Sequence, residues 1–227
     1  MQANLEELLV DELRDIYYAE KQLVKTLPKL AKAASSSDLR QAFESHLKET
    51  EGHVTRLEKA FELLDESARG KTCHGILGII EEGDELIKTH GRKKGSALDA
   101  GLIAGGQRAE HYEMAAYGTL RAWAEALGHD EVADLLAATL EEEKAADEKL
   151  SELAEAGIND AATVSKANGR GRAEEKDKDD EDEGENSKEL GRTSDRKASG
   201  AERRPARMKM TGNGPSGQAS RRAGSRR

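Results

Sequence analysis

Four glutamates fall where the spacing of apolar residues predicts the buried face of a helix: Glu20, Glu110, Glu113 and Glu143. Each interrupts a stripe of apolar residues that recur every three or four positions, and Glu110 and Glu113 are three apart on one stripe. A buried ionised carboxylate is costly unless it is paired or binds a metal. Because three helices place acids inward, we expect these acids to share one site, where their mutual repulsion requires a cation.

Residues 37–66 offer further ligands for such a cation. His46 and His53 flank Glu49 along one side of the helix expected there, so either histidine is a candidate ligand beside Glu49. With the four glutamates, Glu49 and His53 complete a candidate set for iron or manganese. The alternative is that acids at the edge of a stripe reach solvent or pair with a nearby cation. The cations available for such pairs are Arg56, Lys144 and Lys149.

The elements that must position these residues are long helices. Apolar residues recur with helical period over residues 4–34, 37–66, 73–88, 97–127 and 130–157. The short segment 73–88 falls in the connection between two helical hairpins, and a connection of about thirty residues is typical of a single long crossover. The sequence therefore predicts an all-α protein in which residues 1–160 form a four-helix bundle with one long crossover containing a short helix.

Local signals predict where these helices end. Asn4 is expected to cap the first helix, Gly128 to end the third long helix in the left-handed conformation, and Asp130 to cap the helix that follows. Pro28 lacks a backbone donor and is expected to kink or end the first helix there. Gly157 is expected to end the last helix.

Composition favours solvated helices over sheets, since charged residues make up 36% of the chain and aromatic residues only 3%. Cys73 is the single cysteine, so no intramolecular disulfide is possible, and we expect it to pack as a small apolar residue. Residues 1–11 carry three acidic and no basic residues, unlike a signal peptide, and no apolar run approaches the roughly 18 residues of a membrane span. We therefore expect a cytoplasmic protein with no membrane association.

Residues 161–227 differ in character from the rest of the chain. They contain few bulky apolar residues, too few to offset chain entropy, and are expected to be a disordered charged tail. Residues 174–189 are acidic and residues 190–227 are arginine-rich. The basic part is expected to give weak, sequence-independent nucleic-acid binding, against which the acidic part competes.

Several blocks of the sequence carry a resemblance to a known family. They are residues 15–27, 46–50, 73–82, 110–113 with 117–120, and 140–150. In these blocks the chain resembles the YciF family of bacterial stress-associated ferritin-like proteins, and the likeness covers residues 5–158. The resemblance implies a ferritin-like, rubrerythrin-like bundle, a homodimer, and an association with osmotic, acid or oxidative stress.

The wider di-iron group implies a frame of ligands that this sequence matches in part. The second helix has Thr50-x-x-His53 in place of Glu-x-x-His, with the acid displaced to Glu49, and the histidine expected on the fourth helix is replaced by Ala146. The remaining oxygen-rich ligands suffice for one metal or for a weaker pair. The glutamates that match the frame are Glu20, Glu110, Glu113 and Glu143.

Three functions of different classes remain open at this point. The bundle binds iron or manganese and handles oxygen or peroxide, or it has lost the metal site and is a non-catalytic dimeric interaction protein, or its basic tail attaches it to DNA as a protective protein. The sequence contains no phosphate-binding glycine loop, nucleophile elbow or zinc knuckle. Whether the chain is an enzyme is left open by these patterns.

Overall fold

The structure is a computed structural model that describes residues 4–163, and this part of the chain is helical. It contains α1 (Leu5–Ala33), α2 (Ser37–Leu63), α3 (His74–His90), α4 (Ser96–Leu127), α5 (Asp130–Leu153) and the π-helical turn η1 (Ala154–Ile158). The five predicted helices are confirmed, and helical structure continues to residue 163, just beyond the boundary expected at residue 160. The predictions for the acidic and arginine-rich parts of the tail lie outside the described residues.

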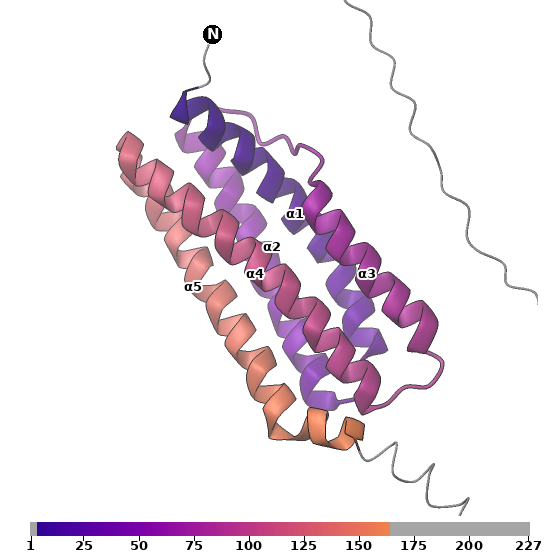
Figure 1. Cartoon of the computed structure of the whole chain (residues 1–227). Coiled ribbons are helices and arrows are strands. Elements are labelled where there is room, and N and C mark those ends of the chain that lie inside the picture. The colour runs from indigo at the N-terminus through magenta and orange to yellow at the C-terminus, as the bar shows by residue number, and fades with distance from the viewer. Residues whose placement is uncertain (1–3, 164–227) are drawn as a thin grey trace, which may run out of the picture. The chain divides into compact units, whose positions relative to one another are not determined.

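Four of the helices form a bundle in which each packs against two neighbours. α1 contacts α2 and α4, and α5 contacts the same two helices (Figure 1). α3 lies alongside α4 and α1, on the connection that leads from α2 to α4. The fold is therefore a ferritin-like four-helix bundle with one long crossover that contains a short helix, as the sequence predicts.

Two of the predicted helix ends are confirmed in atomic detail. The Asn4 side chain accepts a hydrogen bond from the Glu7 backbone N–H, and the Glu7 side chain accepts one from the Asn4 N–H, which makes a complete capping box. Gly128 ends α4 with a φ of 80°, a left-handed conformation that favours glycine. These ends fix the length of the first and third bundle helices.

Three predictions about helix ends need correction. α1 continues through Pro28 to Ala33, because Pro28 lies on the exposed face and the apolar residues around it stay packed. His129, not Asp130, is the N-cap of α5, since the turn at Gly128 already places Asp130 in the first helical turn. α5 changes to the π-helical turn η1 after Leu153, although Gly157 does leave helical geometry with a φ of 142°.

Two apolar clusters fill the interior, and a polar band separates them. One cluster includes Leu57 and Phe61 of α2 with Leu136 of α5. The other includes Phe43 of α2 with Leu150 of α5. The buried polar residues that lie between these cluster residues along the two helices are His46, Thr50 and His53 on α2 and Thr139 and Glu143 on α5.

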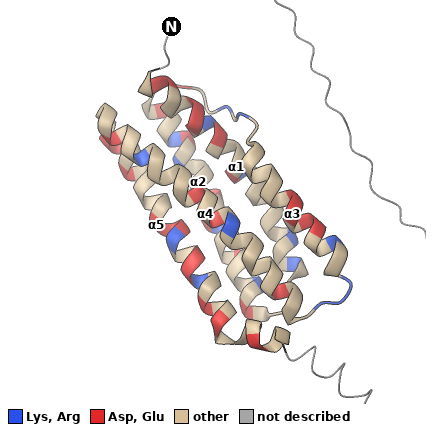
Figure 2. Cartoon of the chain, viewed as in Figure 1, with Lys and Arg blue, Asp and Glu red and all other residues tan. Residues whose placement is uncertain are grey.

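The outer faces of the helices carry mixed charge. Figure 2 shows acidic and basic residues interspersed along α5, where Lys144 pairs with Glu141 and Lys149 with Glu152 at three-residue spacing. Such exposed pairs contribute little stability, so the bundle depends mainly on its two apolar clusters. Among the described helices, none combines the length and the apolar character that a membrane crossing requires.

Asp99 joins the start of α4 to the turn between α1 and α2. Its two carboxylate oxygens accept hydrogen bonds from the Ser35 and Ser36 backbone N–H groups at 2.8 and 2.9 Å, and the residue is buried. We expect Asp99→Ala to lower the free energy of unfolding by about 2–3 kcal/mol, because two backbone donors lose their partner. Urea unfolding followed by circular dichroism measures this loss. Exposed Asp134→Ala is the control, and equal stability of the two variants would contradict the assigned role.

Candidate metal centre

The four predicted glutamates converge in the polar band of the bundle. Glu20 comes from α1, Glu110 and Glu113 from α4, and Glu143 from α5. Their exposed fractions are 0%, 3%, 1% and 0% in that order. The placement follows from the sequence, because the apolar neighbours of each glutamate on its helix face turn that face toward the core.

The carboxylates and two histidines form two overlapping groups whose ligand atoms lie within 4.8 Å of one another. The first group contains His46, Glu110, Glu113 and Glu143, and the second contains Glu20, His53 and Glu143. Glu143 belongs to both groups. Nitrogen and carboxylate oxygen atoms therefore surround two adjacent positions that share one carboxylate.

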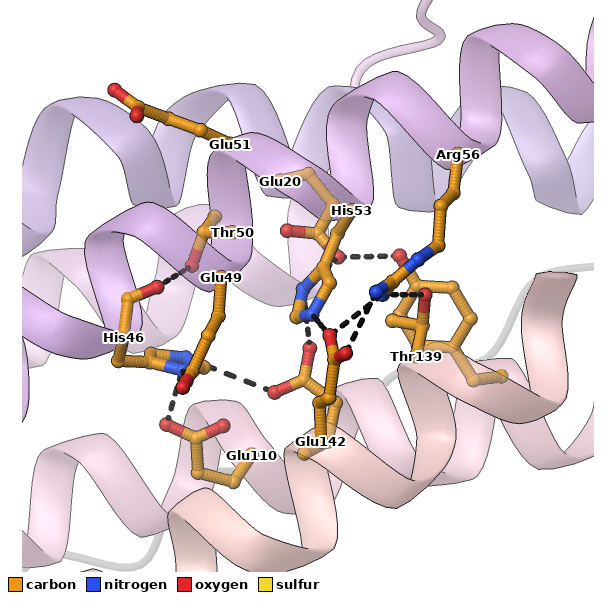
Figure 3. A network of polar contacts seen from close by, with 12 residues as sticks. Glu20, His46, Glu49, Thr50, Glu51, His53, Arg56, Glu110, Thr139 and Glu142 are labelled. Atoms are coloured by element: carbon orange, nitrogen blue, oxygen red, sulfur yellow. Dashed lines mark hydrogen bonds and ion pairs between the residues drawn. The ribbon is translucent and has the colours of Figure 1, made fainter.

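His46 connects the first group to a carboxylate on its outer side. Its Nε2 lies 3.3 Å from Glu110 Oε1 and 3.7 Å from Glu143 Oε2. Its Nδ1 lies 3.3 Å from Glu49 Oε2 (Figure 3). The inner nitrogen thus faces the buried acids, while the outer nitrogen is held by a half-exposed carboxylate.

His53 repeats this arrangement in the second group. Its Nδ1 lies 3.0 Å from Glu143 Oε1 and 3.4 Å from Glu20 Oε1. Its Nε2 lies 2.9 Å from Glu142 Oε2, and Arg56 holds that carboxylate with two hydrogen bonds of 2.6 and 2.7 Å (Figure 3). Histidines that bind metals commonly have their second nitrogen held by a carboxylate in this way.

Most buried polar atoms that lack a hydrogen-bond partner belong to this cluster. Within the described part of the chain, both oxygens of Glu113 and of Glu143 have none, and neither do one oxygen each of Glu20 and Glu110 and the Nδ1 atom of His53. Glu143 Oε1 and His53 Nδ1 do form an ion pair at 3.0 Å, but without the geometry of a hydrogen bond. Buried polar groups in native proteins are nearly always satisfied. Unsatisfied acceptors that point into one small volume are therefore the pattern expected of cation ligands.

The cations that could have neutralised these acids are used elsewhere. Among the described residues, the buried polar set contains no lysine or arginine. The three cations proposed as alternative partners lie on the outside of the cluster and pair with other carboxylates. These pairs are Arg56 with Glu142, Lys144 with Glu141 and Lys149 with Glu152. The alternative in which surface cations neutralise the four glutamates is thus excluded by the geometry.

Burial shifts the protonation of the cluster strongly. It raises the pKa values of Glu110 and Glu113 well above the ordinary carboxyl value, and the charge of Glu143 adds to the effect. Burial alone would lower the pKa of His53, but its two carboxylate neighbours outweigh burial and raise the pKa to about 10. Burial is the largest single effect on Glu143 and raises its pKa, but the contacts with His53, His46 and Glu110 together outweigh burial, and the pKa falls below the ordinary value.

Tyr117 completes the inner wall of the second group. Its hydroxyl donates a hydrogen bond to Glu20 Oε1, and the phenol is fully buried. Burial raises the pKa of Tyr117, and the charge of Glu20 raises it further, so the phenol remains a donor over the whole physiological range. One oxygen of Glu20 is thereby oriented, while the other has no partner.

The structure brings together five of the six predicted ligands and leaves one aside. Glu49 is half-exposed and lies outside both groups, where it contacts only the outer nitrogen of His46. His46, a candidate that the predicted set left out, takes the inner position. Glu142, which the sequence did not single out, holds His53. A signal for His46 exists, because it follows Phe43 by three residues and precedes Thr50 by four on the buried face.

Fold and site together define a class: a ferritin-like helical bundle with a buried carboxylate–histidine cluster at its centre. Residues 4–163 match the family described as "Domain of unknown function (DUF892)". The chain belongs to this DUF892 family.

Relatives with names and structures support this membership. Protein YciF of Escherichia coli (strain K12) is 44% identical over 159 residues, which are 70% of this chain and 95% of that protein. The crystal structure of the E. coli stress protein YciF matches with a TM-score of 0.66 at 43% identity, covering 70% of this chain and 99% of that one. YcfI of Rhodopseudomonas palustris matches with a TM-score of 0.62 at 47% identity, covering 66% and 94%. The predicted resemblance to the YciF family is confirmed.

Proposed function

We propose that this YciF relative binds a pair of iron or manganese ions in its bundle and acts through them in a stress response. The observation that carries the proposal is the set of unsatisfied, fully buried carboxylate oxygens on three helices. A protonated His53 offsets at most one of the four glutamate charges, so a bound cation would stabilise the ionised form of the remaining acids. The stress role rests on likeness, since the E. coli relative is described as a stress protein.

The donor set suits these metals. His46, Glu110 and Glu113 would hold one ion and Glu20 with His53 the other, with Glu143 shared between them. Each position offers carboxylate oxygens and one imidazole nitrogen, a donor set that iron and manganese commonly take. Structural zinc sites are usually rich in thiolate, and calcium sites use oxygen ligands without nitrogen. The residues of this chain therefore fit a dinuclear centre although Ala146 and Thr50 replace two ligands of the wider di-iron frame.

The outer carboxylates prepare the two histidines for this role. Glu49 faces the Nδ1 of His46, and Glu142 faces the Nε2 of His53. An acceptor on the outer nitrogen keeps a proton there, so the inner nitrogen is the one that would lose its proton to an arriving ion and present its lone pair to the site. Arg56 in turn fixes Glu142 with two parallel hydrogen bonds. The ligand geometry is thus set before any ion arrives.

When bound, an iron or manganese pair supplies electron transfer to dioxygen or peroxide. The chain's own contribution is to exclude bulk water and to manage protons at the ligands. Burial raises the pKa values of Glu110 and Glu113, so an ion that binds there would compete with protons for their oxygens. The two apolar clusters on either side of the polar band close the site to solvent along the length of the bundle.

Metal analysis of the full chain tests this proposal. We expect protein purified without chelators or a metal-affinity column, then equilibrated anaerobically with Fe²⁺ or Mn²⁺ and dialysed, to retain about two ions per chain. Elemental analysis against protein concentration gives the ratio. The matched control is the same protein equilibrated with Mg²⁺, which the nitrogen ligands disfavour. A correctly folded protein that retains neither Fe²⁺ nor Mn²⁺ would contradict the proposed function.

A further inference from the structure

A pocket of about 590 Å³ lies between α2 and α5 and reaches the candidate metal centre. Its inner end is formed by His46 and Glu110, two members of the first ligand group. Its walls combine apolar side chains with small ones, so space remains between the helices. Ala42, Phe43, Ala145, Ala146 and Leu150 are among these wall residues.

The mouth of this pocket is acidic. Asp38 and Glu49 are exposed on α2 and line the outer part. Glu142 on the facing helix also lines the pocket, but its charge is paired with Arg56. The one lysine in the lining, Lys149, is paired at 3.0 Å with Glu152. The excess negative charge attracts cations and repels anions at the opening.

The inner end of the pocket presents an unsatisfied ligand. Glu110 is 3% exposed, lines the pocket, and has one carboxylate oxygen without a hydrogen-bond partner. His46 stands beside it, with Nδ1 toward Glu49 and Nε2 toward Glu110 and Glu143. Carboxylate oxygens therefore continue from the exposed mouth to the buried cluster, and His46 lies between them.

A second pocket also reaches the cluster but has a different chemistry. It holds about 30 Å³, room for about two water molecules, and lies among α1, α3 and α4. Apart from Thr26, His46, Glu110 and Glu113, its lining consists of apolar side chains and glycines. A hydrated divalent cation is charged and gives up its water ligands reluctantly. A narrow apolar passage therefore excludes it.

From these observations we propose that the pocket between α2 and α5 is the path by which hydrated divalent cations reach the buried centre. Asp38 and Glu49 draw the cation from solvent, and the cation exchanges water for protein ligands at Glu110 beside His46. This inference rests on the proposed function, since it assumes that the centre binds metal. It adds where the ion passes and which residues outside the centre control the rate of loading.

The rate of Mn²⁺ uptake by the full-length, metal-free protein tests the path. Free Mn²⁺ has an electron paramagnetic resonance signal that is lost on binding, so the signal reports loading directly. Ala42→Leu fills the pocket one turn before His46 at only a small cost in helix propensity. Asp38→Asn removes one charge at the mouth and leaves the centre intact. The matched controls are Ala115→Leu and Glu51→Gln, which alter exposed residues outside the pocket lining; Figure 3 shows Glu51 pointing away from the cluster.

We expect Ala42→Leu to load at least about tenfold more slowly than wild type and to reach the same final metal content. Asp38→Asn should load about threefold more slowly at low ionic strength, and high salt should remove that difference. Both controls should load as wild type does. If Ala42→Leu is poorly folded by circular dichroism, Asp38→Asn decides the question.

Two outcomes are distinguishable failures. A wild-type protein that binds Mn²⁺ while the pocket variants load at the wild-type rate overturns the path and leaves the metal centre standing. A wild-type protein that takes up no Mn²⁺ even after prolonged incubation overturns the proposed function and this inference with it.

Discussion

Glu143→Ala is expected to empty the metal centre almost completely, whereas His53→Ala leaves about one ion per chain. Glu143 is the residue common to both ligand groups, and both of its oxygens are buried without a hydrogen-bond partner. His53 belongs to one group only, so its removal leaves His46, Glu110, Glu113 and Glu143 in place. Elemental analysis after equilibration with Mn²⁺ gives the number of ions retained by each variant.

The control for this comparison is Glu148→Ala, which removes an exposed glutamate from the same helix. It should retain as many ions as wild type. Loss of ions in all three variants would point to damage of the fold, which circular dichroism detects. Metal content in Glu143→Ala equal to that of wild type would contradict the shared role of Glu143 and with it the dinuclear arrangement.

The positions of the four glutamates could be predicted because helical periodicity is a local property. Glu20 lies four residues after Ile16 and three before Leu23, and all three are buried in α1. The same reasoning correctly gave the number and order of the helices, since each amphipathic face needs a partner. The effect of Pro28 on α1 was harder to predict. The cost of the lost backbone hydrogen bond depends on whether the freed carbonyl faces solvent, and Pro28 is exposed.

The choice between Glu49 and His46 depends on the rotation of α2 about its own axis, since a shift of the buried face by one position exchanges the residues that point inward. The apolar residues Leu47 and Val54 suggest a buried face one position further along than the structure has it. The buried residues are instead His46 and His53, with Leu47 and Val54 at the edge. Tertiary packing decides such a rotation, because α2 must match α1 and α5 at once. Because the core here contains polar residues, a pattern based on hydrophobicity alone predicts the wrong buried face for this part of α2.

The sequence did not predict which individual side chains of different helices contact one another outside the four glutamates. Glu142 is the middle residue of three consecutive glutamates on α5, and no local pattern separates it from Glu141. Only the approach of α2 brings its carboxylate to His53 and Arg56. The pocket that leads to His46 is likewise a product of small residues on two helices, Ala42 and Ala146 among them.

The protonation of the cluster makes the stability of the metal-free protein depend on pH in an unusual direction. The pKa values of Glu110 and Glu113 are raised in the folded state, first by burial and then by the charge of Glu143. The pKa of His53 is raised from 6.5 to about 10 by its carboxylate partners, against the opposing effect of burial. A group whose pKa is higher in the folded state stabilises the fold below its unfolded pKa, and that stabilisation is lost as pH rises through its folded pKa.

We therefore expect the metal-free protein to lose stability as pH rises from about 5 to 9, with a fall in Tm of roughly 5–10 °C. The lowered pKa of Glu143 acts in the opposite sense, but its stabilisation is lost only as pH falls below the ordinary carboxyl value of 4.5, outside this range. Thermal unfolding of the protein freed of metal by a chelator and then dialysed measures the trend. Glu113→Gln removes one buried titrating group and should flatten the fall, while exposed Glu148→Gln should not.

Metal should reverse this dependence. An ion competes with the protons on Glu110 and Glu113, so its binding becomes tighter as pH rises, and tighter binding to the folded state raises Tm. With excess Mn²⁺, the gain in Tm over the metal-free protein is expected to be small at pH 5 and largest near pH 9, where protons compete least with the ion. A metal-free protein whose Tm rises across this range, or a gain from Mn²⁺ that shrinks with pH, would show that the buried acids are not held by protons in the absence of a cation.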